Sequence, residues 1–512
     1  MNKDEKLLFS AAKNGDTGTV QRLLKGGVNV NATTPNKWTA LMLAALHGRT
    51  DTVRYLLKNN ANPYATFKNS AMNAFLLAVR SGSVDTVRLF LDKTVIDINH
   101  QSEYERWEEE HGTQMPTPLM LAAEYGHADV IKLLIEKGAD FSIMDGGGQN
   151  ALCIAAQNGQ VSAVAAFFEL GLANANSGDY WKTPILTIAA GNGHKDLVQF
   201  LLDNGAEVNR LGGFGGSSTA IKDAVCDNHI EIVKLLLDAG ADVNLGDKIG
   251  GLKTGNAEPV LIMACRTYDK KINIDMLKLL LDAGADVNAT GNCNDTALFD
   301  AVDDNRNIDA VRLLLENGAD VNLGRETPLI STLYEGYSKN DKDKRAMVQL
   351  LLQYGADVHR CSDIGLHSPV MLAAVHHPEC LPLLIEAGAD INYVCRGITD
   401  YYSYTALMWA AEDGVTESVK ILLENGADIH AKNKNGRTAL DLAMMGQHTE
   451  IVQLLQAAGA KNSENYCPQT EKKKNEEEQL FEVFQAAFGA ISENKDEIAK
   501  IYQQLFNNMD KK

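Results

Sequence analysis

The sequence predicts an all-α solenoid built from a stack of short helix pairs. Three observations carry this prediction. One phrase recurs along most of the chain, its copies are commonly spaced by 33 or 34 residues, and each copy holds apolar residues at helical spacing. The 512 residues exceed an ordinary domain of about 100–150 residues, and the repetition indicates one array rather than several unrelated domains.

The recurring phrase has a constant order of residues. A Thr-Ala-Leu or Thr-Pro-Leu opening is followed by two small residues, a Gly, an apolar triplet and finally Gly-Ala-Asp-x-Asn. Clear copies begin at Thr39, Thr117, Thr296 and Thr405. The first residue of the small pair marks thirteen repeats, at Ala11, Ala44, Ala78, Ala122, Ala155, Ala189, Ala224, Ala264, Ala301, Thr332, Ala373, Ala410 and Ala443.

Each repeat carries the signals of two helices and a turn. The opening Thr can cap the first helix through its hydroxyl. Prolines occupy a helix-starting position at Pro118, Pro328 and Pro369. In the second helix, Val311, Leu314 and Leu315 have the spacing of one buried face. Glycines that end the second helix in a left-handed conformation are expected at Gly138, Gly205, Gly240, Gly284, Gly318, Gly355, Gly388 and Gly426. The following Asp-x-Asn is expected to turn the chain into an extended finger.

This pattern makes the sequence closely similar to the ankyrin-repeat family over about residues 4–461. The resemblance implies a solenoid whose fingers and first helices form a concave surface that binds protein partners. The sequence departs from the family in one respect, because the His that usually follows Thr-Pro-Leu and bonds between fingers is absent. Its place is held by Met42, Met120, Cys153, Ile262, Phe299, Met371 and Met408. We expect apolar packing to substitute for that His.

Three segments are expected along the chain. Residues 1–461 form the solenoid, and the polar side chains of its first repeat suit an N-terminal cap. Residues 462–478 form a polar linker. Residues 479–512 carry apolar residues at helical spacing and are expected to form a short helical segment, in which Asn494 and Glu497 resemble a capping box. This segment either covers the last repeat or docks elsewhere, and the sequence leaves both open.

Composition limits the partners and the compartment. Acidic residues outnumber basic ones, 67 against 48, and the net charge of −19 repels nucleic acid and anionic membranes. The eight cysteines form no Cys-x-x-Cys pair and no spacing of a zinc site, which favours a reducing compartment. No apolar stretch reaches the roughly 18 residues of a membrane span, and the N-terminus has no signal core. We therefore expect a cytoplasmic protein, with export as an effector left open.

Inserted fingers are the candidates for partner binding. Most fingers are short, but those at residues 99–117, 244–258 and 392–405 carry insertions. Two of the three are rich in aromatic rings, which dominate the binding energy of many interfaces. The partner-binding candidates are Tyr104, Trp107, Tyr393, Tyr401, Tyr402 and Tyr404. The alternative is that these rings fold back to cover their own loops.

No catalytic, metal or cofactor site is evident in the sequence. Glu108, Glu109, Glu110 and His111 point in diverging directions and lack a second cluster that would complete a metal shell. The Gly-rich segment 211–218 lacks the Lys-Ser/Thr ending of a phosphate-binding loop. We therefore expect a non-enzymatic scaffold or adaptor that binds a protein partner and needs no cofactor. Two alternatives stay open. One is a microbial effector or ubiquitin-ligase-type adaptor acting on host proteins, and the other is a ligand- or metal-binding protein or enzyme with its site in the concave groove.

Overall fold

The computed structural model describes most of the chain, namely residues 1–68, 72–101, 116–213, 218–245, 258–266, 271–291, 294–303, 307–334, 344–362, 367–394 and 403–462. These residues hold twenty-six α-helices in thirteen successive pairs and no regular strand. This confirms the predicted all-α solenoid. The chain divides into two compact units, the first with residues 1–332 and 337–356 and the second with residues 333–336 and 357 onward.

The helices are short and regular in length along both units. The first unit contains α1 (Lys3–Asn14), α2 (Thr17–Lys25), α3 (Ala40–Leu46), α4 (Thr50–Lys58), α5 (Ala74–Ser81), α6 (Val84–Lys93), α7 (Pro118–Glu124), α8 (Ala128–Glu136), α9 (Ala151–Gln157), α10 (Val161–Glu169), α11 (Ile185–Gly191), α12 (Lys195–Asp203), α13 (Ala220–Cys226), α14 (Ile230–Asp238), α15 (Val260–Cys265), α16 (Ile274–Asp282), α17 (Ala297–Asp303), α18 (Ile308–Glu316), α19 (Pro328–Leu333) and α20 (Lys344–Gln353). The second unit contains α21 (Pro369–His376), a 3-10 turn (Pro378–Cys380), α22 (Leu381–Glu386), α23 (Ala406–Asp413), α24 (Thr416–Glu424), α25 (Ala439–Met445) and α26 (Thr449–Ala457).

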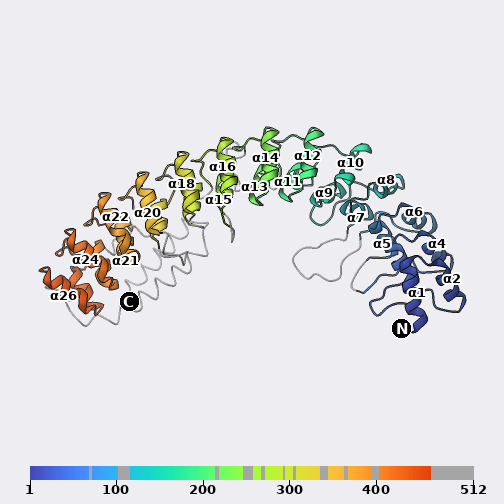
Figure 1. Ribbon diagram of the computed structural model, residues 1–512, viewed down its shortest axis with the longest axis horizontal. Helices are drawn as coiled ribbons and strands as arrows, with labels where there is room; N and C mark the ends of the chain where they lie inside the picture. The colour runs from blue at the N-terminus through green and yellow to red at the C-terminus, as the bar shows by residue number, and fades with distance from the viewer. Residues whose placement is uncertain are drawn as a thin grey trace, which may run out of the picture. The chain divides into compact units, whose positions relative to one another are not determined.

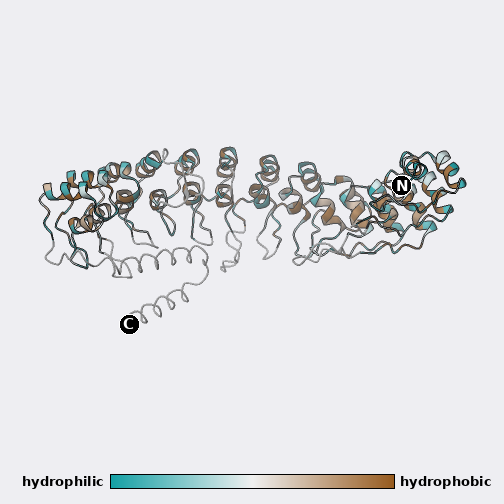
Figure 2. Cartoon of the chain, turned by 90° about the horizontal axis from the view of Figure 1, so that it is seen from below, coloured by the Kyte–Doolittle hydropathy of each residue, from teal (hydrophilic) through white to brown (hydrophobic). Residues whose placement is uncertain are grey.

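Successive repeats stack so that like helices lie next to one another. In the first unit, the first helices of neighbouring repeats pack together, and so do the second helices. Figure 1 shows the second helices α10, α12, α14 and α16 along the top of this unit, with the first helices α9, α11, α13 and α15 beneath them. Within each unit, Figure 2 shows that the described fingers extend from the same side of the helices. The described fingers of neighbouring repeats therefore lie next to one another.

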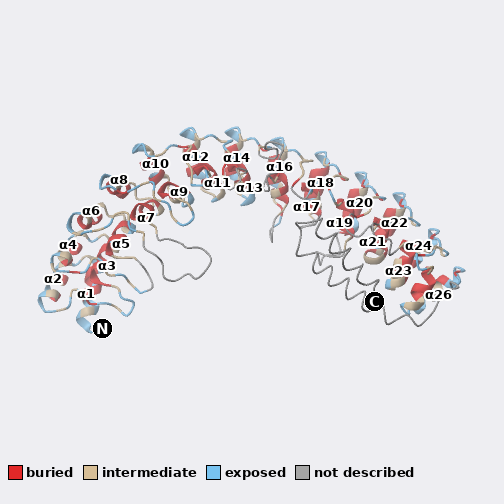
Figure 3. Cartoon of the chain, turned by 180° about the vertical axis from the view of Figure 1, so that it is seen from behind, coloured by how far each residue is buried: buried red, intermediate tan, exposed pale blue. Residues whose placement is uncertain are grey.

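The first helices form the most buried layer. In α3, the side chains of Leu41, Met42, Ala44 and Ala45 have no exposed surface. The small Ala pair lets adjacent helices approach closely, while each buried Leu or Met stabilises the fold by about 1.5–3 kcal/mol. Figure 3 shows this burial on the faces that meet neighbouring helices, with the outer loops exposed.

Helix starts and ends follow the sequence signals. The hydroxyls of Thr39, Thr117 and Thr405 accept the backbone N–H three residues on at 3.2, 3.2 and 3.3 Å. Pro118 and Pro369 are the first residues of α7 and α21. All eight glycines predicted to end a second helix have φ between 81° and 95°. The local signals of the repeat therefore predicted its boundaries correctly.

Buried methionines occupy the place of the missing His. Met42 and Met120 are fully packed, and the Sδ atom of each accepts the backbone N–H of the capping Thr at 3.4 Å. Apolar packing therefore substitutes for the His, as expected. This packing lies within one repeat and leaves the contacts between fingers to other side chains.

A ladder of asparagines links neighbouring fingers. The Asn209 Nδ2 donates to the carbonyl of Gly240 at 3.0 Å, and its Oδ1 accepts the N–H of Asp242 at 2.8 Å. The same pair of bonds to the next repeat recurs at Asn31, Asn176, Asn244, Asn288 and Asn392. The last residue of the Gly-Ala-Asp-x-Asn phrase thus joins repeats that are about 30–40 positions apart.

Histidines between the helices provide a second link. Nε2 of His127 donates to the carbonyl of Arg80 at 2.9 Å, and Nε2 of His194 donates to that of Gln157 at 2.7 Å. Gly159 lies against the ring of His194, where a Cβ would approach Nδ1 within 2.5 Å. These histidines are therefore structural.

Most of the described cysteines are free thiols. Four described cysteines are free thiols, Cys153, Cys226, Cys265 and Cys380. Cys361 is disulfide-bonded, and disulfides are rare in reducing compartments, so this residue disagrees with the expected compartment. No helix in the described part of the chain has the length and apolar character to cross a membrane. Residues 463–478 of the linker and the segment 479–512 lie outside the described residues.

Candidate functional site

The partner-binding candidates from the sequence are only partly placed by the structure. Tyr104, Trp107, Tyr401 and Tyr402 lie outside the described residues. Tyr393 lies on the finger that follows α22 and is 39% exposed, so its ring is accessible for contact.

Tyr404 has a different role from the one expected, because it is only 5% exposed. Its ring centroid lies 6.1 Å from that of Trp409, and the ring of His367 lies 4.6 Å from Trp409 on the same cluster. Burial lowers the pKa of His367 to about 4. Tyr404 therefore packs in an aromatic cluster of the second unit, and its assignment as a partner-binding ring is corrected.

Three consecutive fingers of the first unit form what we call the three-finger surface. It comprises residues 139–150, 172–184 and 206–213. Aspartates hold the turns of the first two fingers. Oδ1 of Asp145 accepts the N–H of Gln149 at 2.9 Å, and Oδ1 of Asp179 accepts the N–H of Thr183 at 2.7 Å. The finger tips are therefore fixed by their own hydrogen bonds.

Tyr180 and Trp181 form an exposed aromatic pair at the tip of the middle finger. They are 64% and 47% exposed, and their rings meet edge to face with centroids 5.1 Å apart. The Tyr180 N–H donates to the carbonyl of Gly148 at 3.1 Å, and a Cβ on Gly148 would lie 3.0 Å from the Cβ of Tyr180. The absence of a side chain at Gly148 allows the two fingers to approach. The rings are thus held on a rigid turn while they face solvent.

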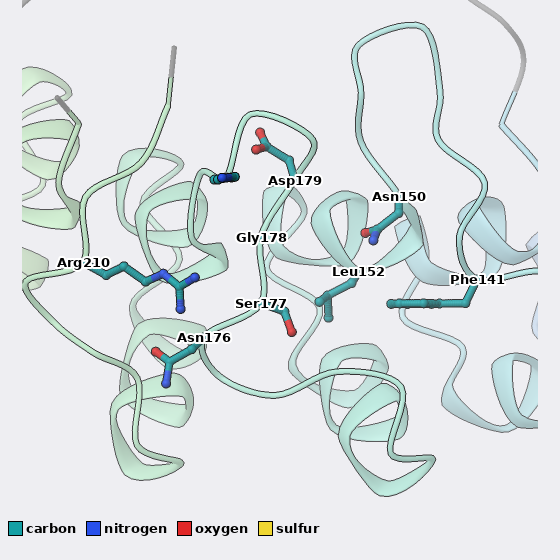
Figure 4. Close-up of a pocket in the computed structure, with 9 residues that line it drawn as sticks. Phe141, Asn150, Leu152, Asn176, Ser177, Gly178, Asp179 and Arg210 are labelled. Carbon is teal, nitrogen blue, oxygen red and sulfur yellow. The ribbon is translucent and has the colours of Figure 1, made fainter. Parts of the chain in front are cut away.

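A pocket of about 310 Å³ opens in the same surface. Figure 4 shows Phe141 and Leu152 on one side of it, with the guanidinium of Arg210 on the other side pointing toward Ser177. Lys182 also lines the pocket. The ring of Phe141 is supported from behind by Phe167, at a centroid distance of 5.2 Å. The pocket therefore has an apolar side and a cationic side.

Lys182 and Arg210, the two cations of the pocket, are both exposed. Neither forms an ion pair within the described parts of the chain. The one carboxylate that lines the pocket, Asp179, already accepts a backbone hydrogen bond from the turn. Two positive charges thus face one negative charge in a chain whose net charge is −19.

A second polar cluster lies in the first unit around Arg266, at the end of α15. Its Nε donates to Oδ2 of Asp300 at 3.1 Å, and its guanidinium also pairs with Asp295 and lies 3.5 Å from Glu258. These carboxylates come from two successive repeats, so the cluster links them. No group of His, Cys, Asp and Glu in the described ranges has the arrangement of a metal site. We interpret this cluster as structural.

Tyr180 and Trp181 are not among the residues predicted from the sequence. That prediction favoured inserted fingers, whereas this pair lies in a finger of ordinary length. The signal was present in the turn itself. Small or polar residues are common at the two central positions of such a turn, and the preceding finger has Gly146 and Gly147 there. The middle finger has Tyr180 and Trp181 at the same positions.

Known proteins resemble this chain through the same repeats. A model of the family "Ankyrin repeats (3 copies)" matches residues 8–102, 108–179, 169–247, 222–325 and 394–466. Ankyrin repeat and SOCS box protein 6 of Homo sapiens is 36% identical over 148 residues, which are 24% of this chain and 33% of that protein. Ankyrin repeat and SAM domain-containing protein 6 of Mus musculus is 43% identical over 91 residues, 17% of this chain and 10% of that protein. E3 ubiquitin-protein ligase XBAT32 of Arabidopsis thaliana is 35% identical over 108 residues, 20% of each chain.

These matches span a third or less of the length of each relative. The family model, by contrast, covers more than half of the present chain. Ankyrin repeats are generally protein-interaction modules. The thirteen helix pairs, the left-handed glycines and the finger row agree with this match, and the chain belongs to the ankyrin-repeat family.

Proposed function

We propose that this protein is a non-enzymatic scaffold that binds a protein partner through its fingers and first helices. The observation that carries the proposal is the exposed Tyr180–Trp181 pair on the three-finger surface. Tyr and Trp are the side chains whose loss most often costs binding energy at protein interfaces.

Preorganisation of the aromatic pair supports the same proposal. The edge-to-face contact of the rings and the hydrogen bond from Tyr180 to Gly148 fix the turn before any partner arrives. A side chain that is already ordered loses less conformational entropy on binding, typically about 0.5–1.5 kcal/mol for each mobile side chain. The pair is therefore well suited to anchor a partner.

The test compares partner affinity in matched variants. The partner is isolated by pull-down with the intact chain, and its affinity is measured by calorimetry. Tyr180→Ala combined with Trp181→Ala is expected to weaken binding by about 2 kcal/mol or more, with little change in melting temperature. Tyr354→Ala serves as the control, because Tyr354 is an exposed aromatic residue that follows α20, away from the three fingers. Unchanged affinity in the double variant would overturn the assignment of this surface.

The inserted fingers remain candidates for the same role. Tyr104→Ala with Trp107→Ala, and separately Tyr401→Ala with Tyr402→Ala, are expected to weaken binding by about 2 kcal/mol or more without lowering stability. The same calorimetric assay measures both pairs. If neither pair changes the affinity, these fingers are not anchors.

A ubiquitin-ligase adaptor is a second candidate function. It is supported by the names of two relatives, one a SOCS box protein and the other an E3 ubiquitin-protein ligase. Purified complexes of the intact chain would then contain ligase subunits and ubiquitylate the bound partner in a reconstituted reaction. Complexes without ligase subunits would argue against the adaptor and leave only the scaffold proposal. Native mass spectrometry that detects a tight stoichiometric ligand would instead favour a ligand-binding protein or an enzyme.

A further inference from the structure

The pocket of the three-finger surface combines two kinds of side chain that one ligand must satisfy together. Phe141 offers apolar surface, with the buried Leu152 beside it, and Arg210 faces them across the pocket (Figure 4). Lys182 adds a second cation to the lining. A volume of about 310 Å³ is at the lower end of the range for small-molecule pockets, which hold about 300–1,000 Å³. It suits one or two side chains of a bound segment.

Lys182 is held in a conformation that other fingers assign to glycine. Its φ is 61°, in the left-handed region, and the equivalent turn positions in two other fingers hold Gly148 and Gly436, with φ of 74° and 72°. A residue with a side chain is disfavoured in this conformation, so the cation at this position costs backbone strain. Lys37 in the second repeat has the same conformation, and the three-finger surface places this feature beside a pocket.

Charge complementarity identifies the kind of partner. The lining holds two cations against one carboxylate, and this carboxylate is engaged by the turn. An incoming carboxylate can accept charge-assisted hydrogen bonds from Arg210 and Lys182, which are stronger than bonds between neutral groups. The apolar side of the pocket then requires an apolar side chain next to that carboxylate.

Resting on the function proposed above, we propose that this pocket binds a segment of the protein partner in which an Asp or Glu lies beside an apolar residue. The carboxylate is held by Arg210 and Lys182, and the apolar side chain packs on Phe141. Tyr180 and Trp181 extend the contact along the middle finger. Binding weakens as ionic strength rises, because the Debye length falls from about 10 Å at 0.1 M salt to about 3 Å at 1 M.

The probe is a displayed library of short random peptides, selected against the intact chain. The selected peptides are expected to share an acidic residue within one or two positions of Leu, Ile, Met or Phe. Their affinities are measured by fluorescence anisotropy with purified protein. Arg210→Gln is expected to weaken binding about tenfold, as is typical for loss of one hydrogen bond to a charged group. Arg88→Gln is the matched control, because Arg88 is an exposed Arg on α6, outside the three fingers.

Two further variants separate recognition from folding. Lys182→Gly removes a cation and relieves the left-handed strain, so peptide affinity falls while the melting temperature does not fall. A purely structural Lys182 would leave the affinity unchanged. Arg210→Glu is expected to lose the acidic peptides and to bind versions in which Lys replaces the acidic residue.

The outcomes distinguish this proposal from the function on which it rests. Selection without an acidic consensus, or equal affinity of the selected peptides for the intact chain and Arg210→Gln, overturns the acidic-segment proposal. If the selected peptides nevertheless bind more weakly to the variant that combines Tyr180→Ala and Trp181→Ala, the three-finger surface remains the binding surface. If neither set of variants changes peptide binding or partner binding, both proposals fail for this surface.

Discussion

Replacing Gly318 with Val tests the geometry that ends each second helix. Gly318 has φ of 87°, and no atom lies within 4 Å of the position that a Cβ would take. A larger side chain therefore meets no neighbour, and the cost of the substitution comes from the backbone alone. A β-branched residue held in the left-handed region costs about 1–3 kcal/mol, which is the expected loss of stability.

Gly318→Asn is the matched control for this substitution. Asn60 adopts φ of 62° at the equivalent position of the second repeat, and Asn tolerates the left-handed region better than other residues with a side chain. We expect Asn to cost less than Val. Because each repeat contacts only its neighbours, native-state hydrogen exchange should show the loss around α18 and α20 rather than along the whole first unit. Equal stability of the Val variant and the intact chain, or equal losses for Val and Asn, would refute this reasoning.

Three other perturbations test separate parts of the structure. Burial lowers the pKa of His367 from 6.5 to about 4, so below pH 6.5 the unfolded chain gains a proton that the folded chain accepts only near pH 4. The free energy of unfolding of the second unit should therefore fall by up to about 3 kcal/mol as the pH is lowered between these values. His367→Phe should abolish this fall, whereas the control His430→Phe, at an exposed position, should retain it. Asn209→Ala removes two hydrogen bonds to the next repeat and should lower the free energy of unfolding by about 1–2 kcal/mol. Hydrogen exchange of the Asp242 N–H, which donates to Asn209 in the intact chain, should become faster. A cut after Lys461 is expected to expose apolar surface on the last repeat and cause aggregation or fraying across residues 438–460, whereas a monomer with unchanged amide protection would favour a docking segment.

Local signals explain why most of the fold could be predicted from the sequence. A Thr cap, a Pro at the first helical position and a left-handed Gly each act within one turn of the chain, so Thr117, Pro118 and Gly138 can be interpreted without knowledge of their neighbours. The thirteen repeats follow because the same signals recur. The apolar substitution of the His at Met42 and Met120 was also predictable, since the replacement residues are themselves apolar.

Contacts between repeats explain what the sequence could not predict. Tyr404 is an aromatic residue next to an inserted finger, and it is buried in a cluster in which Trp409 also contacts His367 of the preceding repeat. The asparagine ladder joins residues about 30–40 positions apart, and the phrase in which each Asn occurs does not indicate its partner. The pocket requires Phe141, Lys182 and Arg210 from three different fingers. Each of these features depends on the stacking of repeats rather than on one segment.

Hydrogen exchange on the intact chain, with and without its bound partner, tests most directly the claim that the fingers and first helices bind a protein. We predict slower exchange in residues 139–150 and 172–184 and in α9 and α11 when the partner is present. The second helices α10 and α12, on the opposite side of the same repeats, should keep their exchange rates. Protection confined to α10 and α12, with no change in the fingers, would contradict binding through the fingers and first helices.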